Sequence, residues 1–93
     1  MYKPTVKEII HQLRLVLDGS LTREEVSNWA ENLSQELEKE QGLKDNDLLV
    51  WKYLDIVSGI DLKDSPTSYL HTEEEIMEWI KDFNNEYASK RTL

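Results

Sequence analysis

The 93-residue sequence contains no cysteine, only two prolines, three glycines and one phenylalanine. The lack of cysteine excludes a disulfide framework, a thiolate zinc site and a cysteine nucleophile. The scarcity of proline and glycine argues against a turn-rich β fold and suits long helices. No apolar run approaches the roughly 18 residues of a membrane span, and no apolar signal region opens the chain. We therefore expect a cytoplasmic protein without membrane attachment.

The chain nevertheless has the composition of a folded globule. Hydrophobic residues make up 39% and charged residues 32%, and three Trp and four Tyr supply large surfaces for burial. A length of 93 residues suits one hydrophobic core and is too short for two. Residues 1–93 are therefore expected to form a single domain.

The charge is strongly acidic and unevenly distributed. The net charge is −8, and residues 18–86 contain 18 acidic and 6 basic residues, a balance of −12. Residues 1–17 and 87–93 each carry a balance of +2. Such a field repels nucleic-acid phosphates and anionic membranes and attracts basic partners. It predicts a basic protein partner and no nucleic acid, unless the acidity serves only solubility.

Helix starts are marked by a repeated capping signature. The pattern Thr-x-x-Glu occurs at residues 5–8, 22–25 and 72–75, where Thr can accept from the N3 amide while Glu reaches back to the Thr amide. Apolar residues recur at steps of three and four after these caps, as amphipathic helices require. The predicted helices cover about 5–18, 23–41, 46–58 and 73–88. The predicted fold is all-α, a compact bundle of four helices with a long loop between the third and fourth.

The helices differ in how much of their surface is apolar. The third is apolar over most of its circumference and is expected to be packed on several sides. The second has a polar outer face on which we place Ser34, and Trp29, Trp51 and Trp79 are expected to join one core.

Residues suited to catalysis are scarce. No glycine-rich phosphate loop, H-E-x-x-H or G-x-S-x-G motif occurs, so neither an enzyme nor a cofactor is expected. The long connection before the fourth helix contains Asp61, Asp64 and His71, which could meet around a divalent cation. Their spacing matches no metal signature, so a metal-dependent accessory domain is an alternative hypothesis only.

Several motifs resemble a family of small acidic bacterial proteins known only as uncharacterised. They are Leu21-Thr22-Arg23-Glu24-Glu25, Trp29-Ala30, Val50-Trp51, Gly59-Ile60-Asp61-Leu62, and Tyr69-Leu70-His71 with Trp79. The resemblance spans nearly the whole chain. It implies a bacterial cytosolic protein and no particular activity.

A looser resemblance concerns the colicin-nuclease immunity proteins, acidic four-helix domains that block a toxic nuclease. Asp64-Ser65-Pro66 and Glu75-Ile76-Met77-Glu78-Trp79 are similar to that family's pattern before and within its last helix. The long apolar third helix lacks the Tyr-Tyr pair that docks on the toxin in that family. No binding residues are carried over from it.

The leading hypothesis from the sequence is a non-catalytic acidic binding protein that engages a basic protein partner, in its most concrete form an immunity-type inhibitor of a toxin. The residues predicted to contact the partner are Asp61, Asp64, Tyr69, Glu74 and Glu78. The alternative is a structural or self-associating helical subunit, and the sequence leaves the oligomeric state open.

Overall fold

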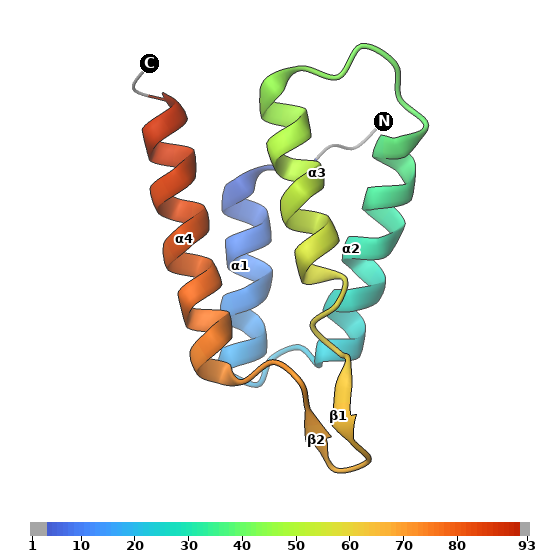
Figure 1. Cartoon of the computed structure of the whole chain (residues 1–93), viewed down its shortest axis with the longest axis vertical. Coiled ribbons are helices and arrows are strands. Elements are labelled where there is room, and N and C mark those ends of the chain that lie inside the picture. The colour runs from blue at the N-terminus through green and yellow to red at the C-terminus, as the bar shows by residue number, and fades with distance from the viewer. Residues whose placement is uncertain (1–3, 92–93) are drawn as a thin grey trace.

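A computed structural model describes residues 4–91 and shows four α-helices and one short antiparallel hairpin within that range (Figure 1). The elements are α1 (Val6–Leu17), α2 (Arg23–Glu38), α3 (Asp45–Val57), β1 (Lys63–Ser65), β2 (Ser68–Tyr69) and α4 (Glu73–Arg91). None of these helices combines the length and apolar character that crossing a bilayer requires. The predicted all-α bundle of four helices is confirmed.

The helices form two antiparallel pairs. Helix α2 runs up one side of the molecule and α3 returns beside it, while α1 and α4 form the other pair (Figure 1). Helix α1 packs against each of the other three helices. The start of α1 and the end of α4 lie at the same end of the bundle, and the β-hairpin projects from the opposite end (Figure 1).

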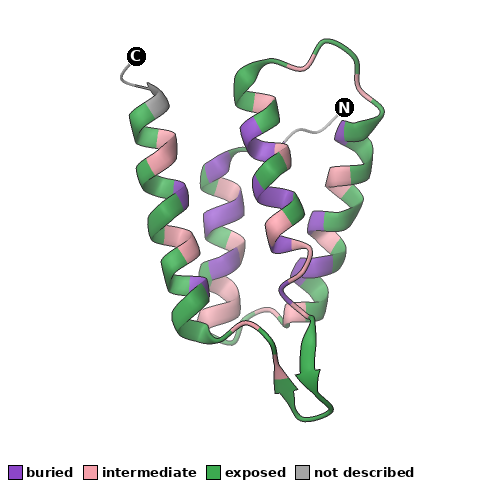
Figure 2. Ribbon diagram, in the orientation of Figure 1, coloured by how far each residue is buried: buried purple, intermediate pink, exposed green. Residues whose placement is uncertain are grey.

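One core lies between the helices, and each helix contributes a buried stripe to it (Figure 2). Its largest fully buried side chain is Tyr53 of α3, which stacks on Phe83 of α4 with ring centroids 3.9 Å apart. Since α3 also packs against α1 and α2, the expectation that this apolar helix contacts several neighbours is met. The four-residue stripe of α1 (Val6, Ile9, Ile10 and Leu13) is at most 3% exposed.

The capping boxes explain why α1 and α2 begin where they do. The Glu8 amide donates to Thr5 Oγ1 at 3.1 Å, and the Glu8 carboxylate accepts from the Thr5 amide at 3.4 Å. Thr22 and Glu25 make the same pair of bonds at 3.1 and 3.0 Å. These bonds satisfy amides that the first turn of a helix leaves without an intrahelical partner.

The structure departs from the sequence predictions in the connection between α3 and α4. We predicted a loop there, and it contains the hairpin β1–β2, in which Lys63 pairs with Tyr69 and Ser65 with Ser68. Strands of three and two residues are too short for an alternating apolar pattern to mark them. Helix α2 also ends at Glu38 rather than near residue 41, while α4 continues to residue 91 instead of 88.

The three Trp residues lie at the edge of the core rather than in its centre. Trp29, Trp51 and Trp79 are half-buried and pack against the buried cluster. The indole N–H of Trp51 donates to Ser34 Oγ at 2.9 Å. Ser34 is therefore not an exposed surface position, as the sequence suggested, but links α2 to α3.

The hydroxyl group of the buried Tyr53 also links α3 to α4. The Tyr53 hydroxyl donates to Glu86 Oε1 at 2.6 Å, and Lys52 Nζ lies 3.4 Å from the other oxygen of that carboxylate. Burial, and then the hydrogen bond to Glu86, raise the pKa of Tyr53 well above its ordinary value. The neutral phenol is thus the form that the fold stabilises.

Removing a cap should destabilise the protein through its helix start alone. Thr5→Ala and Thr22→Ala should each lower the free energy of unfolding by about 0.5–2 kcal/mol, because each leaves a first-turn amide without its side-chain acceptor. Gln35→Ala, at an exposed position of α2, should change it by less than about 0.5 kcal/mol. Urea unfolding followed by circular dichroism measures all three, and equal losses at the three sites would contradict the assignment.

Tyr53→Phe should lower the free energy of unfolding at pH 7 by about 1–2 kcal/mol, because the bond to the Glu86 carboxylate is lost. The native pKa of Tyr53 lies above the unfolded value, so this contribution is complete below about pH 10 and declines as the pH rises further. The difference between the two proteins should therefore shrink at alkaline pH. Urea titrations between neutral and alkaline pH measure the free energy of unfolding of both proteins. If the difference between them stays constant with pH, folding does not raise the pKa of Tyr53.

Candidate functional site

The outward face of α1 carries basic side chains at helical spacing. Lys7, His11 and Arg14 are all exposed and stand at positions i, i+4 and i+7, which places them on one side of the helix. The opposite side is the buried four-residue stripe of α1, so the fold directs these three residues to solvent. We call Lys7, His11 and Arg14 the α1 stripe.

The one carboxylate within this stretch of α1 is engaged in the helix cap. Glu8 belongs to the capping box with Thr5, and its side chain bonds the backbone. The residues of the α1 stripe were not among the candidate site residues predicted from the sequence. The signal was present in the i, i+4, i+7 spacing and in the positive balance of residues 1–17, but the net charge of −8 outweighed it in the sequence analysis.

The residues predicted to meet a protein partner lie on two separate elements. Asp61, Asp64 and Tyr69 belong to the connection and its hairpin, whereas Glu74 and Glu78 are exposed on α4. The structure brings Tyr69 to α2 rather than presenting it as a free aromatic anchor.

Tyr69 is held on both its ring and its hydroxyl. The hydroxyl donates to Glu24 Oε2 at 2.8 Å, and the guanidinium carbon of Arg23 lies 4.3 Å from the ring centroid. Lys63 Nζ lies 5.5 Å from the same centroid. The hydrogen bond from Tyr69 lowers the pKa of Glu24, and the same bond raises the pKa of Tyr69.

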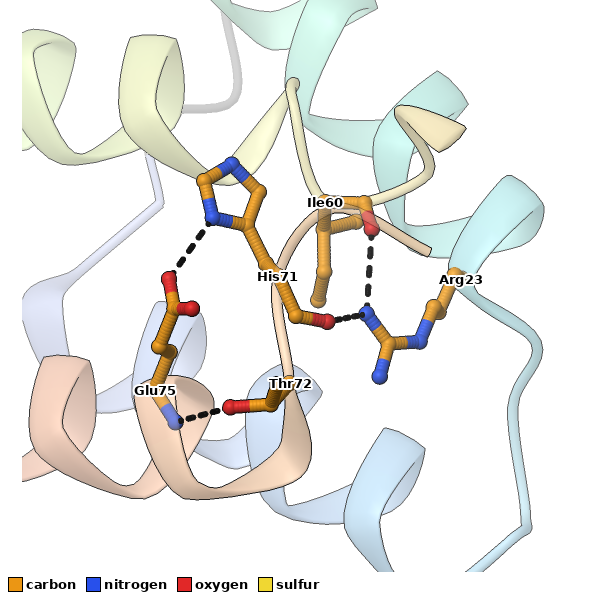
Figure 3. Close-up of polar contacts among 5 residues, drawn as sticks. All are labelled: Arg23, Ile60, His71, Thr72 and Glu75. Carbon is orange, nitrogen blue, oxygen red and sulfur yellow. Dashed lines mark hydrogen bonds and ion pairs between the residues drawn. The ribbon is translucent and has the colours of Figure 1, made fainter. Parts of the chain in front are cut away.

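Arg23, the first residue of α2, ties together two segments that follow α3 (Figure 3). Its Nη1 donates to the carbonyl oxygen of His71 at 2.6 Å and to that of Ile60 at 3.3 Å. Ile60 is fully buried just after α3, and His71 immediately precedes the cap of α4. A single guanidinium therefore sets where the connection leaves α3 and where it enters α4.

The ring of His71 lies beside the Glu75 carboxylate at the start of α4 (Figure 3). Its Nδ1 lies 3.0 Å from Glu75 Oε2, and its ring meets Trp79 edge-on at 4.9 Å. The hydrogen bond from His71 lowers the pKa of Glu75, whose amide donates to Thr72 Oγ1 at 3.1 Å. In the capping signature of residues 72–75, the Glu75 carboxylate thus contacts His71.

A metal site at Asp61, Asp64 and His71 is not formed. Across residues 4–91 of the structure, no group of three or more His, Asp or Glu side chains is arranged to hold a metal ion. His71 instead contacts Glu75 through Nδ1.

Comparison with known proteins identifies the family. The family model described as "YxzC DNA-binding protein" matches residues 3–83, which is most of the chain. This chain belongs to the YxzC family. It is 42% identical over 76 residues to the "Uncharacterized protein YxzC" of Bacillus subtilis (strain 168), an alignment covering 82% of this chain and 59% of the relative. No solved structure matches the chain.

Membership of the YxzC family bears on the two resemblances noted in the sequence, to small uncharacterised bacterial proteins and to colicin-nuclease immunity proteins. The expectation of a family of small uncharacterised bacterial proteins is confirmed. The resemblance to colicin-nuclease immunity proteins finds no support. The chain also spans only 59% of the length of its Bacillus relative, so the two proteins are alike over part of that relative alone.

The function and partner predicted from the sequence are wrong. A basic protein partner, toxin inhibition and the exclusion of nucleic acid all conflict with a family described as DNA-binding. The physical error was to treat net charge as a uniform field. Binding depends on the charge of the surface that makes contact, and in this YxzC-family protein the α1 stripe differs in sign from the chain as a whole.

Arg23→Ala should loosen the connection between α3 and α4. The variant loses the donor to two carbonyls, so the free energy of unfolding should fall by about 1–3 kcal/mol. The amide of Leu70, which donates to the Leu62 carbonyl at 2.9 Å beside the hairpin, should exchange with deuterium faster. Arg14→Ala, at an exposed position of α1, is the matched control and should leave that exchange rate unchanged. Equal rates in the two variants would mean that Arg23 does not hold the connection.

Proposed function

We propose that this chain binds DNA through the α1 stripe, Lys7, His11 and Arg14. The family description names DNA as the ligand, and the exposure of all three residues on one face of α1 is the observation that selects the surface. The proposal is one of binding without catalysis. It also implies a cytoplasmic location, because that compartment holds the chromosome of a bacterium.

The dimensions of the stripe suit contact with a phosphate backbone. From Lys7 to Arg14, seven residues at 1.5 Å each extend about 10 Å along α1. Positive side chains at this spacing can meet successive phosphates or the two edges of a groove about 12 Å wide. Contacts of this kind position a protein on DNA and carry no sequence information directly.

The rest of the surface should make binding directional and weak. Residues 18–86, with a balance of −12, repel phosphates that approach any other face. Two or three phosphate contacts give a slope of log K against log salt of only about −2 to −3, since each contact contributes about −0.9. Affinity should thus be measurable at low salt and fall as salt rises.

Fluorescence anisotropy with a short labelled DNA duplex at low salt tests the proposal. Lys7→Glu combined with Arg14→Glu should weaken binding at least about tenfold and reduce the salt slope by about 2, because two phosphate contacts are lost. Circular dichroism checks that the double variant remains as helical as the unmodified protein.

The control variant has the same net charge. Lys39→Glu with Lys81→Glu reverses two exposed bases, one at the C-cap of α2 and one on α4, and should weaken binding by less than about threefold. If this control loses as much affinity as the α1 variant, only the total charge matters and the α1 stripe is not the contact surface. If the unmodified chain fails to bind the duplex at low salt, the DNA-binding proposal itself is wrong.

A further inference from the structure

A cleft between α2 and α3 lies apart from the α1 stripe. It has a volume of about 390 Å³ and is lined by Ser34 and Glu38 of α2 and by Trp51 and Asp55 of α3. This volume lies within the range of small-molecule sites, about 300–1,000 Å³. We propose that the cleft binds a linear polyamine, a flexible chain with ammonium groups at both ends. The proposal does not depend on DNA binding.

The charge of the cleft selects a cation. Its two ionisable lining residues, Glu38 and Asp55, are both exposed carboxylates. In the described part of the chain, neither forms an ion pair with a basic side chain. Their charges are therefore available to ammonium groups of a ligand, each of which offers several N–H donors.

The position of the two carboxylates selects an elongated cation. Helices α2 and α3 are antiparallel neighbours, and the bond from Trp51 to Ser34 sets these two residues at one level. Glu38 follows Ser34 by four residues, and Asp55 follows Trp51 by four residues. Because the two helices are antiparallel, Glu38 and Asp55 lie on opposite sides of the level of the Trp51–Ser34 bond. At a rise of 1.5 Å per residue, the backbone positions of the two residues are about 12 Å apart along the helices. A linear cation spans such a separation more readily than a compact ion.

The middle of the cleft offers an aromatic wall. Trp51 is half-buried, and its N–H is already bonded to Ser34, which holds the indole in one orientation. An indole face attracts cationic groups, and its apolar surface suits methylene groups. Carboxylates at the two ends and an indole between them match the alternation of ammonium and methylene groups in a polyamine.

Titration with spermidine, a linear triamine, tests the proposal. The indole ¹H–¹⁵N resonance of Trp51, assigned with Trp51→Phe, should shift and saturate. Hexaamminecobalt(III), a compact cation of the same charge, should leave that resonance nearly unchanged because it spans the cleft less readily. Equal shifts with the two cations would overturn the proposal, as would the absence of a saturable shift with spermidine.

Paired variants separate the cleft from the general acidity. Glu38→Gln with Asp55→Asn should weaken spermidine binding about tenfold, the product of about threefold for each exposed ion pair. Glu74→Gln with Glu78→Gln removes two exposed carboxylates of α4, outside the cleft, and should weaken binding less than twofold. Equal losses in the two double variants would mean that spermidine associates with the acidic surface as a whole. Neither double variant alters the α1 stripe, so the DNA assay reports on that proposal separately.

Discussion

The buried stripe of α1 is the constraint on which the rest of the structure depends. Val6, Ile9, Ile10 and Leu13 are at most 3% exposed, and α1 packs against all three other helices. Exposing this stripe would return four large aliphatic side chains to water, at about 1.5–3 kcal/mol for each. Rotation of α1 is thereby prevented. Because the helix cannot rotate, Lys7, His11 and Arg14 must face outward on the other side.

Charge is unevenly distributed along this chain. The positive balances lie in residues 1–17 and 87–93, whereas residues 18–86, which include most of α4, carry a balance of −12. A net charge of −8 describes what a distant ion experiences, whereas a bound phosphate responds to charges within about a Debye length, near 8 Å at physiological ionic strength. That difference is why the exclusion of nucleic acid from composition alone was unsound.

The connection between α3 and α4 is ordered by polar contacts more than by apolar burial. Leu62 and Leu70 are 53% and 48% exposed, so they do not form the apolar lid that such residues commonly provide. Arg23 instead donates to the carbonyls of Ile60 and His71 and lies against the ring of Tyr69. A guanidinium suits this role because its planar fork offers several donors and its face stacks on aromatic rings.

The sequence by itself determined the features that rest on short-range periodicity. The capping boxes at Thr5 and Thr22, the apolar stripes and the number of helices all follow from interactions between residues three or four positions apart. The three bases of the α1 stripe were also readable at that spacing. They were not selected as candidates because a composition argument was given more weight.

Only the tertiary structure decided which residues meet across the bundle. Arg23 reaches carbonyls 37 and 48 residues away, and Trp51 finds Ser34 on the neighbouring helix. The Tyr69 hydroxyl likewise reaches Glu24 of α2, 45 residues away. Such contacts depend on the relative placement of helices, which no local pattern encodes. The cleft between α2 and α3 has the same origin, since its lining residues come from two helices that pack side by side.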